Sequence, residues 1–313
     1  MNRYIWIILL LLGLVAPFAA YPVFLMKLYC FALFACAFNL LLGYAGLLSF
    51  GHAAFFGGAA HITGYLVKNS GLTPELGILA GTVAAGLLGF IFGSLAIRRQ
   101  GIYFAMVTLA LAQIVYFAAL KSDFTGGEDG LQDIPRGLLF GLFDLGKSYD
   151  VGGRSLELNL YYFVFAIFCI GFWIIHRAIH SPFGQVLAAI RENEPRAVSL
   201  GYRVERVKLL AFVISSSLAG MAGATKALVF QLASLTDVSW HTSGEVVLMT
   251  LLGGLGTVLG PLVGAFTVVT LHSELSSIGS WVTVVIGAIF VVCVLAFRRG
   301  FVGELGRLLK RSL

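Results

Sequence analysis

Charged residues are scarce in this sequence of 313 residues. Only 12% are Asp, Glu, Lys or Arg, 59% are hydrophobic, and the mean hydropathy is +0.94. Ordinary soluble domains carry ~25% charged residues, and a soluble surface needs more polar side chains than this chain has. The composition therefore excludes soluble enzymes, disordered proteins and nucleic-acid binders. At ~20 apolar residues per membrane crossing, there is room for roughly eight to eleven crossings in one transmembrane domain.

Cysteines and catalytic motifs are also few. The four cysteines lie in apolar stretches without metal-ligand spacing, the six histidines are scattered, and neither H-E-x-x-H nor G-x-S-x-G occurs. We therefore predict no catalytic, metal or cofactor-binding site in this chain. GLFDLGKS at 141–148 matches the phosphate-binding loop, but loop residues follow it where a helix is needed. We interpret it as a chance match, so any ATP would be bound by another chain.

Ten hydrophobic segments predict an all-α membrane protein. The eighth and ninth are short and broken by glycines, so they are either two spans or one re-entrant hairpin. The first resembles a signal peptide, but we interpret it as a retained helix because the next span follows at once. The ten segments lie at 4–21, 24–42, 49–67, 73–97, 102–120, 158–178, 208–232, 243–257, 259–273 and 281–297.

The basic residues orient these spans. Stretch 176–208 has six Arg or Lys against three acids, the tail 298–313 is also basic, and Arg98 and Arg99 end the fourth span. By the positive-inside rule all three belong in the cytoplasm. Stretch 121–157 has seven acids against four bases and belongs outside. Ten spans with both termini in the cytoplasm satisfy every placement.

Two loops are long enough to carry a function. The outer loop 121–157 is rich in glycine and contains the acid pair Glu128 and Asp129, which we predict to help dock a substrate-delivering protein; the alternative is a solvated connector. The inner loop 179–207 has helical composition with Pro195 in its middle, which predicts two short helices. Its mixed charge favours docking on a protein over a lipid surface.

Two glycine-rich segments interrupt the apolar runs, one in each half of the chain. Segment 43–60 contains Ser49 and His52, and segment 243–265 contains the glycines GGLG at 253–256. Unwound backbone of this kind forms substrate sites between the repeats of transporters, whereas tight helix packing is the alternative. The candidate residues of a translocation path are Ser49, His52, Gly253, Gly254 and Gly256.

Six stretches together resemble the permease subunits of branched-chain amino acid ABC importers, LivM type. Their order and spacing match over nearly the whole chain. The stretches are GLLSFGHAAFFG (46–57), GIYFAMVTLA (101–110), FTGGEDGL (124–131), SPFGQVLAAIRENEPRAVSLGY (181–202), LLAFVISSSLAGMAGA (209–224) and SGEVVLMTLLGGLGTVLGP (243–261).

The resemblance implies a type II-like importer fold in the bacterial inner membrane. It implies a LivH-type permease that completes the path, two ATPase subunits that bind ATP, and a periplasmic binding protein. It also makes the inner loop the ATPase-contacting element. Gly184 and Gly201 bracket that loop, and its matching positions are Ala188, Ala189, Arg191, Asn193, Pro195, Ala197 and Gly201.

The substrate is less well defined by the resemblance. Branched-chain or related hydrophobic amino acids are expected, and urea, short amides and aromatic acids are the alternatives within the family. Many relatives have a tyrosine near the position of His61, so His61 joins the candidate path residues. A secondary transporter of small polar solutes is a second alternative, but the scarcity of charges within the spans, where only Lys226 is clearly placed, argues against ion coupling.

Overall fold

The computed structural model describes residues 3–99, 101–141, 143–151, 154–275, 284–288, 291 and 300–308. Helices dominate them, and short strands occur in one loop. The α-helices are α1 (Arg3–Ala19), α2 (Pro22–Asn39), α3 (His52–Asn69), α4 (Pro74–Ala96), α5 (Ile102–Lys121), α6 (Leu158–Ile179), α7 (Pro182–Glu192), α8 (Glu194–Ser199), α9 (Val204–Phe230), α10 (Trp240–Gly253), α11 (Gly260–Leu275) and α13 (Gly300–Leu308). A π-helical turn (Leu40–Tyr44) extends α2, and 3-10 turns lie at Asp123–Thr125 and Leu235–Val238.

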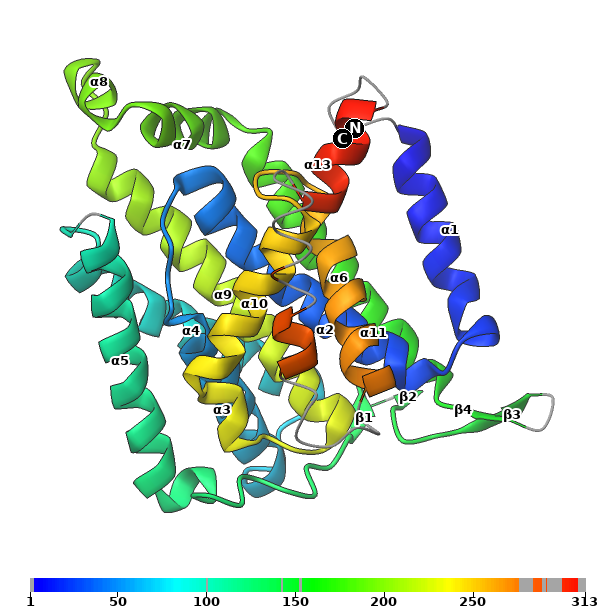
Figure 1. The fold of residues 1–313 in the computed structure, drawn as a ribbon. Helices are drawn as coiled ribbons and strands as arrows, with labels where there is room; N and C mark the ends of the chain where they lie inside the picture. The colour runs from blue at the N-terminus through cyan, green and yellow to red at the C-terminus, as the bar shows by residue number, and fades with distance from the viewer. Residues whose placement is uncertain are drawn as a thin grey trace.

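The helices run between two ends of the molecule (Figure 1). The first, here named the α7 end, carries α7, α8, α13 and the first turn of α1. The opposite end, here named the loop end, carries the segment that joins α5 to α6. This arrangement fits the expectation that both termini lie beside the inner loop. Which side of a membrane each end faces stays a prediction from the charges.

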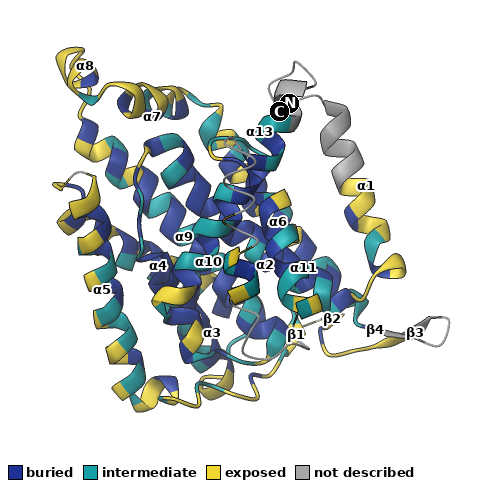
Figure 2. Ribbon diagram, in the orientation of Figure 1, coloured by how far each residue is buried: buried dark blue, intermediate teal, exposed yellow. Residues whose placement is uncertain are grey.

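The core lies where α2 and α9 pass through the middle of the bundle (Figure 2). Small residues let the neighbouring helices approach closely. A Cβ on Gly223 of α9 would overlap the backbone of Phe56 in α3, and one on Gly89 of α4 would overlap Ser216 of α9. Gly57 and Gly264, which lie in the two segments that the sequence singled out, are packed as closely, because a Cβ on them would overlap backbone atoms of Asp237 and Met249. Glycine in these segments thus also serves packing, as the alternative interpretation expected.

Within the described residues, five of the expected spans are helices long and apolar enough to cross a membrane. They are Pro22–Tyr44, Pro74–Ala96, Ile102–Lys121, Leu158–Ile179 and Val204–Phe230. α10 and α11 have 14 and 16 residues, about 21 and 24 Å of helix, which is less than the ~30 Å apolar core of a bilayer. The expected span 281–297 lies largely outside the described residues. The chain is a multi-pass membrane protein, and the count of ten spans stays a prediction.

The third expected span, 49–67, is helical only from His52 onward. Residues 46–49 are non-helical, and a turn at 50–51 leads into α3. The broken eighth and ninth segments form two separate helices, α10 and α11, which are joined by a turn at the α7 end (Figure 1). Both glycine-rich segments therefore contain a break in the helix, as their composition predicted.

The fold is mostly helical, as expected, and the loop between α5 and α6 adds short strands to it. It contains two small antiparallel hairpins, β1 (Leu138–Leu139) with β2 (Phe143–Asp144) and β3 (Tyr149–Val151) with β4 (Arg154–Leu156). Leu139 pairs with Phe143, and Asp150 pairs with Ser155. The phosphate-loop match at 141–148 spans β2 and is followed by β3, so it lacks the helix that a nucleotide site needs.

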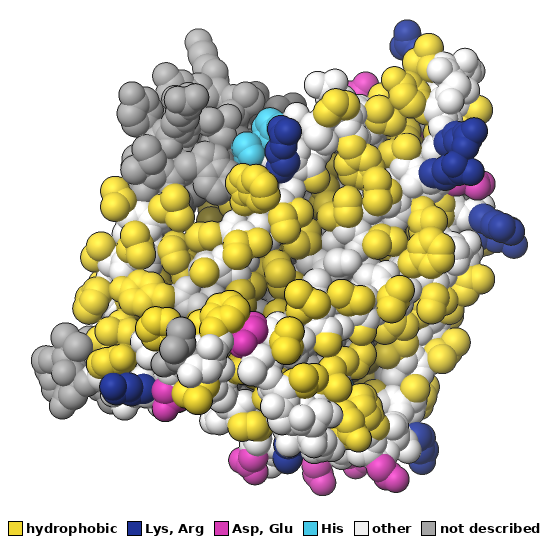
Figure 3. Space-filling model, turned by 180° about the vertical axis from the view of Figure 1, so that it is seen from behind, with side chains coloured by type: hydrophobic (Ala, Val, Ile, Leu, Met, Phe, Trp, Pro, Cys, Tyr) yellow, Lys and Arg dark blue, Asp and Glu magenta, His cyan; other side chains and the backbone are white. Residues whose placement is uncertain are grey.

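The surface between the two ends is apolar. Figure 3 shows hydrophobic side chains over most of one face, with Lys and Arg gathered toward the α7 end and most acids at the loop end. Exposed large hydrophobic residues on α4, α5 and α6 belong to this band, among them Leu87, Met106 and Trp173. Such a band fits contact with lipid acyl chains.

Candidate functional site

The inner loop forms two short helices that project from the α7 end (Figure 1). Pro182 opens α7, and a Cβ on Gly184 would overlap the carbonyl of Ile179, because α7 folds back over the end of α6. Leu187 is the fully buried side chain on the inner face of α7. Ala188 and Ala189 are exposed on it. This leaves one face of α7 open for a partner.

α8 begins where the sequence predicted a break. Asn193 caps it, since its side-chain oxygen accepts a hydrogen bond from the Arg196 backbone N–H at 3.1 Å, and Pro195 lies in its first turn. Ala197 is buried against Ile190. The prediction of two helices divided by Pro195 is confirmed. That these helices contact an ATPase stays a prediction.

The two glycine-broken segments meet inside the bundle. The Ala53 N–H, in the first turn of α3, donates to Ser243 Oγ in the first turn of α10 at 3.0 Å. From there the helices diverge. α3 leads to the loop end, where Lys68 donates to the Gln132 carbonyl, and α10 leads to the α7 end. The N-termini of two helices, each with a partial positive charge, therefore lie side by side within the bundle.

Residues around the break in the third span satisfy their backbone groups locally. Ser49 is fully buried, and its Oγ accepts from the Gly51 N–H at 3.2 Å. The Phe50 N–H donates to Thr108 Oγ1 at 3.2 Å. Non-helical backbone at membrane depth requires such partners, which accounts for the polar residues in an apolar run.

His52 lies fully buried at the start of α3. Ser215 Oγ donates to the Ala37 carbonyl at 2.5 Å, so the N–H on His52 Nε2 is the donor of the 2.8 Å bond to Ser215 Oγ. These two hydrogen bonds link α3, α9 and α2. Three aromatic rings stand edge-on around the imidazole: Phe38, Phe55 and Phe212. His52 thus contributes to core packing in this structure.

His61 lies in the third turn of α3 and is also buried. Its Nδ1 donates to the Gly57 carbonyl at 2.8 Å, which leaves Nε2 as an acceptor without a hydrogen-bond partner among the described residues. The side chain lies within electrostatic reach of Lys226 and Asp237. His52 Nδ1 likewise has no hydrogen-bond partner among the described residues, so each of the two histidines keeps one unpaired acceptor.

Lys226 and Asp237 form a buried ion pair that the sequence reasoning missed. Lys226 Nζ lies 2.7 and 2.5 Å from the two carboxylate oxygens, and the side chains are 12% and 8% exposed. Asp237 also caps its own 3-10 turn by accepting from the Ser234 N–H at 3.3 Å. The spacing Ser234-x-x-Asp237 is a helix-start signal that could have marked this carboxylate.

The outer loop is fixed to the bundle. Leu131 and Ala233 exchange backbone hydrogen bonds. Arg136 pairs with Glu157 at 2.5 Å and also donates to the Val229 carbonyl at 3.0 Å. Glu128 and Asp129 are exposed at the loop end. The loop is thus a platform held against the end of α9, and the docking role of its acids stays a prediction.

Comparison with known proteins identifies the family. Residues 23–294 match the family model described as branched-chain amino acid transport system / permease component. The chain belongs to this family of permeases. Its LivM relatives in Escherichia coli and Salmonella typhimurium are 28% and 29% identical over 270 residues, which are 81% of this chain and 63% of each relative. The chain therefore spans less than two thirds of their length.

Other relatives of the permease are named for the import of different substrates. The ribose import permease of Bacillus subtilis is 28% identical over 255 residues, 77% of this chain and 73% of the relative. No solved structure matches the chain. The resemblance to LivM-type permeases is confirmed. The relatives are named for different transported substrates, branched-chain amino acids for some and ribose for another.

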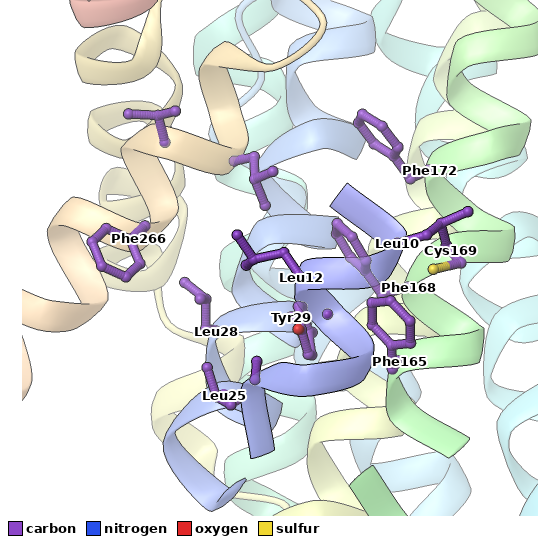
Figure 4. Close-up of a pocket in the computed structure, with 14 residues that line it drawn as sticks. Leu10, Leu12, Leu25, Leu28, Tyr29, Phe165, Phe168, Cys169, Phe172 and Phe266 are labelled. Atoms are coloured by element: carbon purple, nitrogen blue, oxygen red, sulfur yellow. The ribbon is translucent and has the colours of Figure 1, made fainter. Parts of the chain in front are cut away.

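The permease also has an apolar cleft beneath α1 (Figure 4). α1 precedes the residues that match the family, and the cleft lies between it and α2, α6 and α11. None of the predicted path residues lines it. Its lining includes Leu12, Leu28, Phe165, Phe168 and Phe266.

A tyrosine of α6 fixes α1 beside this cleft. Pro17 lies inside α1 and has no N–H, so the Gly13 carbonyl four residues earlier lacks its helical donor. Tyr161 supplies the missing donor, with its hydroxyl 2.6 Å from that carbonyl, and Tyr29 in turn donates to Tyr161 at 3.0 Å. The sequence contains Pro17, but only the tertiary structure reveals its partner.

Tyr161→Phe is expected to destabilise the permease by about 1–2 kcal/mol, because it leaves a buried carbonyl without a donor. Denaturant unfolding in detergent micelles measures this. Tyr162→Phe is the matched control, since its hydroxyl makes only a long, exposed contact of 3.3 Å to the Leu14 carbonyl. Equal stability of the two variants would contradict the anchoring role of Tyr161.

Proposed function

We propose that this permease is the inner-membrane subunit of an ATP-driven importer and forms half of its translocation path. The observation that carries the proposal is the family match over residues 23–294. The multi-pass helices, the apolar belt and the projecting α7–α8 pair support it. In this proposal two separate ATPase subunits bind ATP and dock on α7 and α8, and the permease itself catalyses nothing.

The proposed substrates are branched-chain or related hydrophobic amino acids. The two LivM relatives support this class, and the paired starts of α3 and α10 offer a place for a carboxylate. Helix N-termini attract anions, and broken helices position them so in transporters. Urea, short amides, aromatic acids and, from the relatives' names, ribose are outcomes that the substrate assay must separate.

The proposed partners follow the same family. A LivH-type permease would complete the path, and a periplasmic binding protein would deliver substrate to the loop end. The ion pair Lys226–Asp237 supports ATP-driven transport over ion coupling. Lys226 is the charged residue that the sequence places clearly within a span, and Asp237 neutralises it. Ion-coupled transporters usually place further acids or bases within their spans.

Reconstitution tests the function. The permease, its second permease and the ATPases are placed in proteoliposomes with the binding protein, and uptake of labelled leucine is measured with and without ATP. ATP-dependent leucine uptake is expected. Uptake driven by an ion gradient without ATP would favour the secondary transporter, and ATP-dependent uptake of ribose alone would overturn the substrate class.

Reversing the acid pair tests docking at the loop end. The variant Glu128→Lys with Asp129→Lys is expected to slow uptake most at low salt, because exposed charges steer a partner and are screened as salt rises. Uptake measured from about 10 mM to about 500 mM salt checks this, over which the Debye length falls from ~30 Å to a few ångströms. A loss that is independent of salt, or no loss, would contradict docking through these acids.

A further inference from the structure

Three glycines from the two broken segments form a seat for Arg191 of α7. Its guanidinium donates to the Gly43 carbonyl in the π-helical turn. A Cβ on Gly46 would lie 3.1 Å from Arg191 Cγ, and one on Gly256 would lie 3.3 Å from Arg191 Nη1. The arginine side chain therefore lies across both segments. It leaves little room for any side chain at positions 46 and 256, where the chain has glycine.

Asn39 fastens the two segments to each other directly beneath this seat. The side chain is buried at 3% exposure, and its amide donates to the Thr257 carbonyl at 2.9 Å while its oxygen accepts from the Gly256 N–H at 3.1 Å. A Cβ on Gly43 would lie 2.7 Å from the Gly256 nitrogen. The turn at 40–46 and the turn at 254–257 thus form one unit, here named the glycine junction.

The glycine junction connects to the helices of both halves of the chain. On one side it leads through the π-helical turn into α2 and through residues 45–51 to the start of α3. On the other side it links α10 to α11. Gly46 and Gly256 have positive φ of +71° and +73°, a conformation that glycine adopts without strain. A displacement of the junction therefore reaches both helices whose N-termini meet inside the bundle.

We propose that Arg191 is a positioning residue that transmits movement of α7 to the glycine junction, and does not itself bind the ATPase. Arg191 is exposed on α7, as Ala188 and Ala189 are, but its guanidinium is directed back at the Gly43 carbonyl of the membrane domain. A planar group with five fixed donors suits this task, because it holds several partners in one geometry. The inference rests on the proposed ATP-driven function and adds the contact through which the coupling passes.

The experiment compares three variants in the complete reconstituted complex. Arg191→Leu removes the seated guanidinium, Ala189→Asp alters the exposed face of α7, and Arg99→Leu removes an exposed charge at the same end but away from α7. The measurements are the ratio of ATPase to permease on co-purification and the stimulation of ATP hydrolysis by the substrate-loaded binding protein. Elution as one species on size exclusion shows that each variant is folded.

Arg191→Leu is expected to retain the ATPase subunits while losing stimulation by about tenfold, within the ~5–150-fold range of coupling between sites. Ala189→Asp should lose the ATPase, and Arg99→Leu should match the wild type. Arg191→Lys keeps a cationic donor and should recover part of the stimulation. If Arg191→Leu does not fold, Arg191→Lys serves as the test instead. It should then show reduced stimulation while it retains the ATPase subunits.

Two results would overturn the inference. Loss of the ATPase in Arg191→Leu to the extent seen in Ala189→Asp would make Arg191 a docking residue. Wild-type stimulation in both Arg191 variants would remove it from the coupling route. Failure of the proposed function is distinguishable from both, because the wild-type complex would then show no stimulation at all.

Discussion

Lys226→Ala is expected to lower the free energy of unfolding of the permease by about 3–5 kcal/mol. The substitution leaves the Asp237 carboxylate buried, at 8% exposure, without its cation. An uncompensated charge in the interior costs far more than the ion pair contributes, since both groups have already lost their hydration. Asp237→Ala should have a similar effect, with the added loss of the 3-10 turn cap at Ser234.

A double-mutant cycle checks the cause of this loss. Removing both charges in Lys226→Met with Asp237→Leu should cost less than either of these two substitutions alone, because no charge then stays unpaired. Glu245→Gln is the matched control. Glu245 pairs with His272 at 3.4 Å with both side chains about one-third exposed, and such pairs contribute ~1 kcal/mol or less. Losses that simply add in the double variant would contradict a coupled pair.

Gly201→Glu is expected to abolish coupled transport. Gly201 follows α8 with a φ of +87° and closes a helix-end motif, in which its N–H donates to the Val198 carbonyl and the Tyr202 N–H donates to the Ala197 carbonyl. A side chain at this φ costs roughly 1–2 kcal/mol. The strain redirects the chain that leads into α9, and the carboxylate adds a charge on the proposed ATPase side.

Two further substitutions separate strain from charge. None of the described residues lies within 4 Å of a Cβ on Gly201, so a larger side chain meets no steric barrier from them. Gly201→Asn tolerates the left-handed conformation and should retain most uptake. Gly201→Ala carries the strain alone and should fall between Asn and Glu. Uptake and ATPase stimulation in proteoliposomes measure the series, and wild-type values for Gly201→Glu would remove this residue from the coupling element.

The sequence by itself determined the elements whose signal is local. Long apolar runs predicted α2, α4, α5, α6 and α9 to within a few residues, because a continuous run of ~20 apolar residues has few stable alternatives in a bilayer. Pro195 divided the inner loop into two helices, since a proline nitrogen lacks the hydrogen that a helix interior needs. The glycine content also located both breaks, at residues 43–60 and 243–265.

Only the tertiary structure decided which of these segments meet. Asn39 and Gly256 are 217 positions apart, Ala53 and Ser243 are 190 apart, and Tyr161 lies 148 positions from Gly13. No local pattern encodes such pairs, because each depends on how whole helices pack. The same holds for Arg191. The sequence placed it in a loop expected to face a partner, whereas in the folded structure its side chain is directed at the glycine junction. Sequence spacing specifies the backbone of each segment, whereas the buried polar groups find their partners only once the bundle has closed around them.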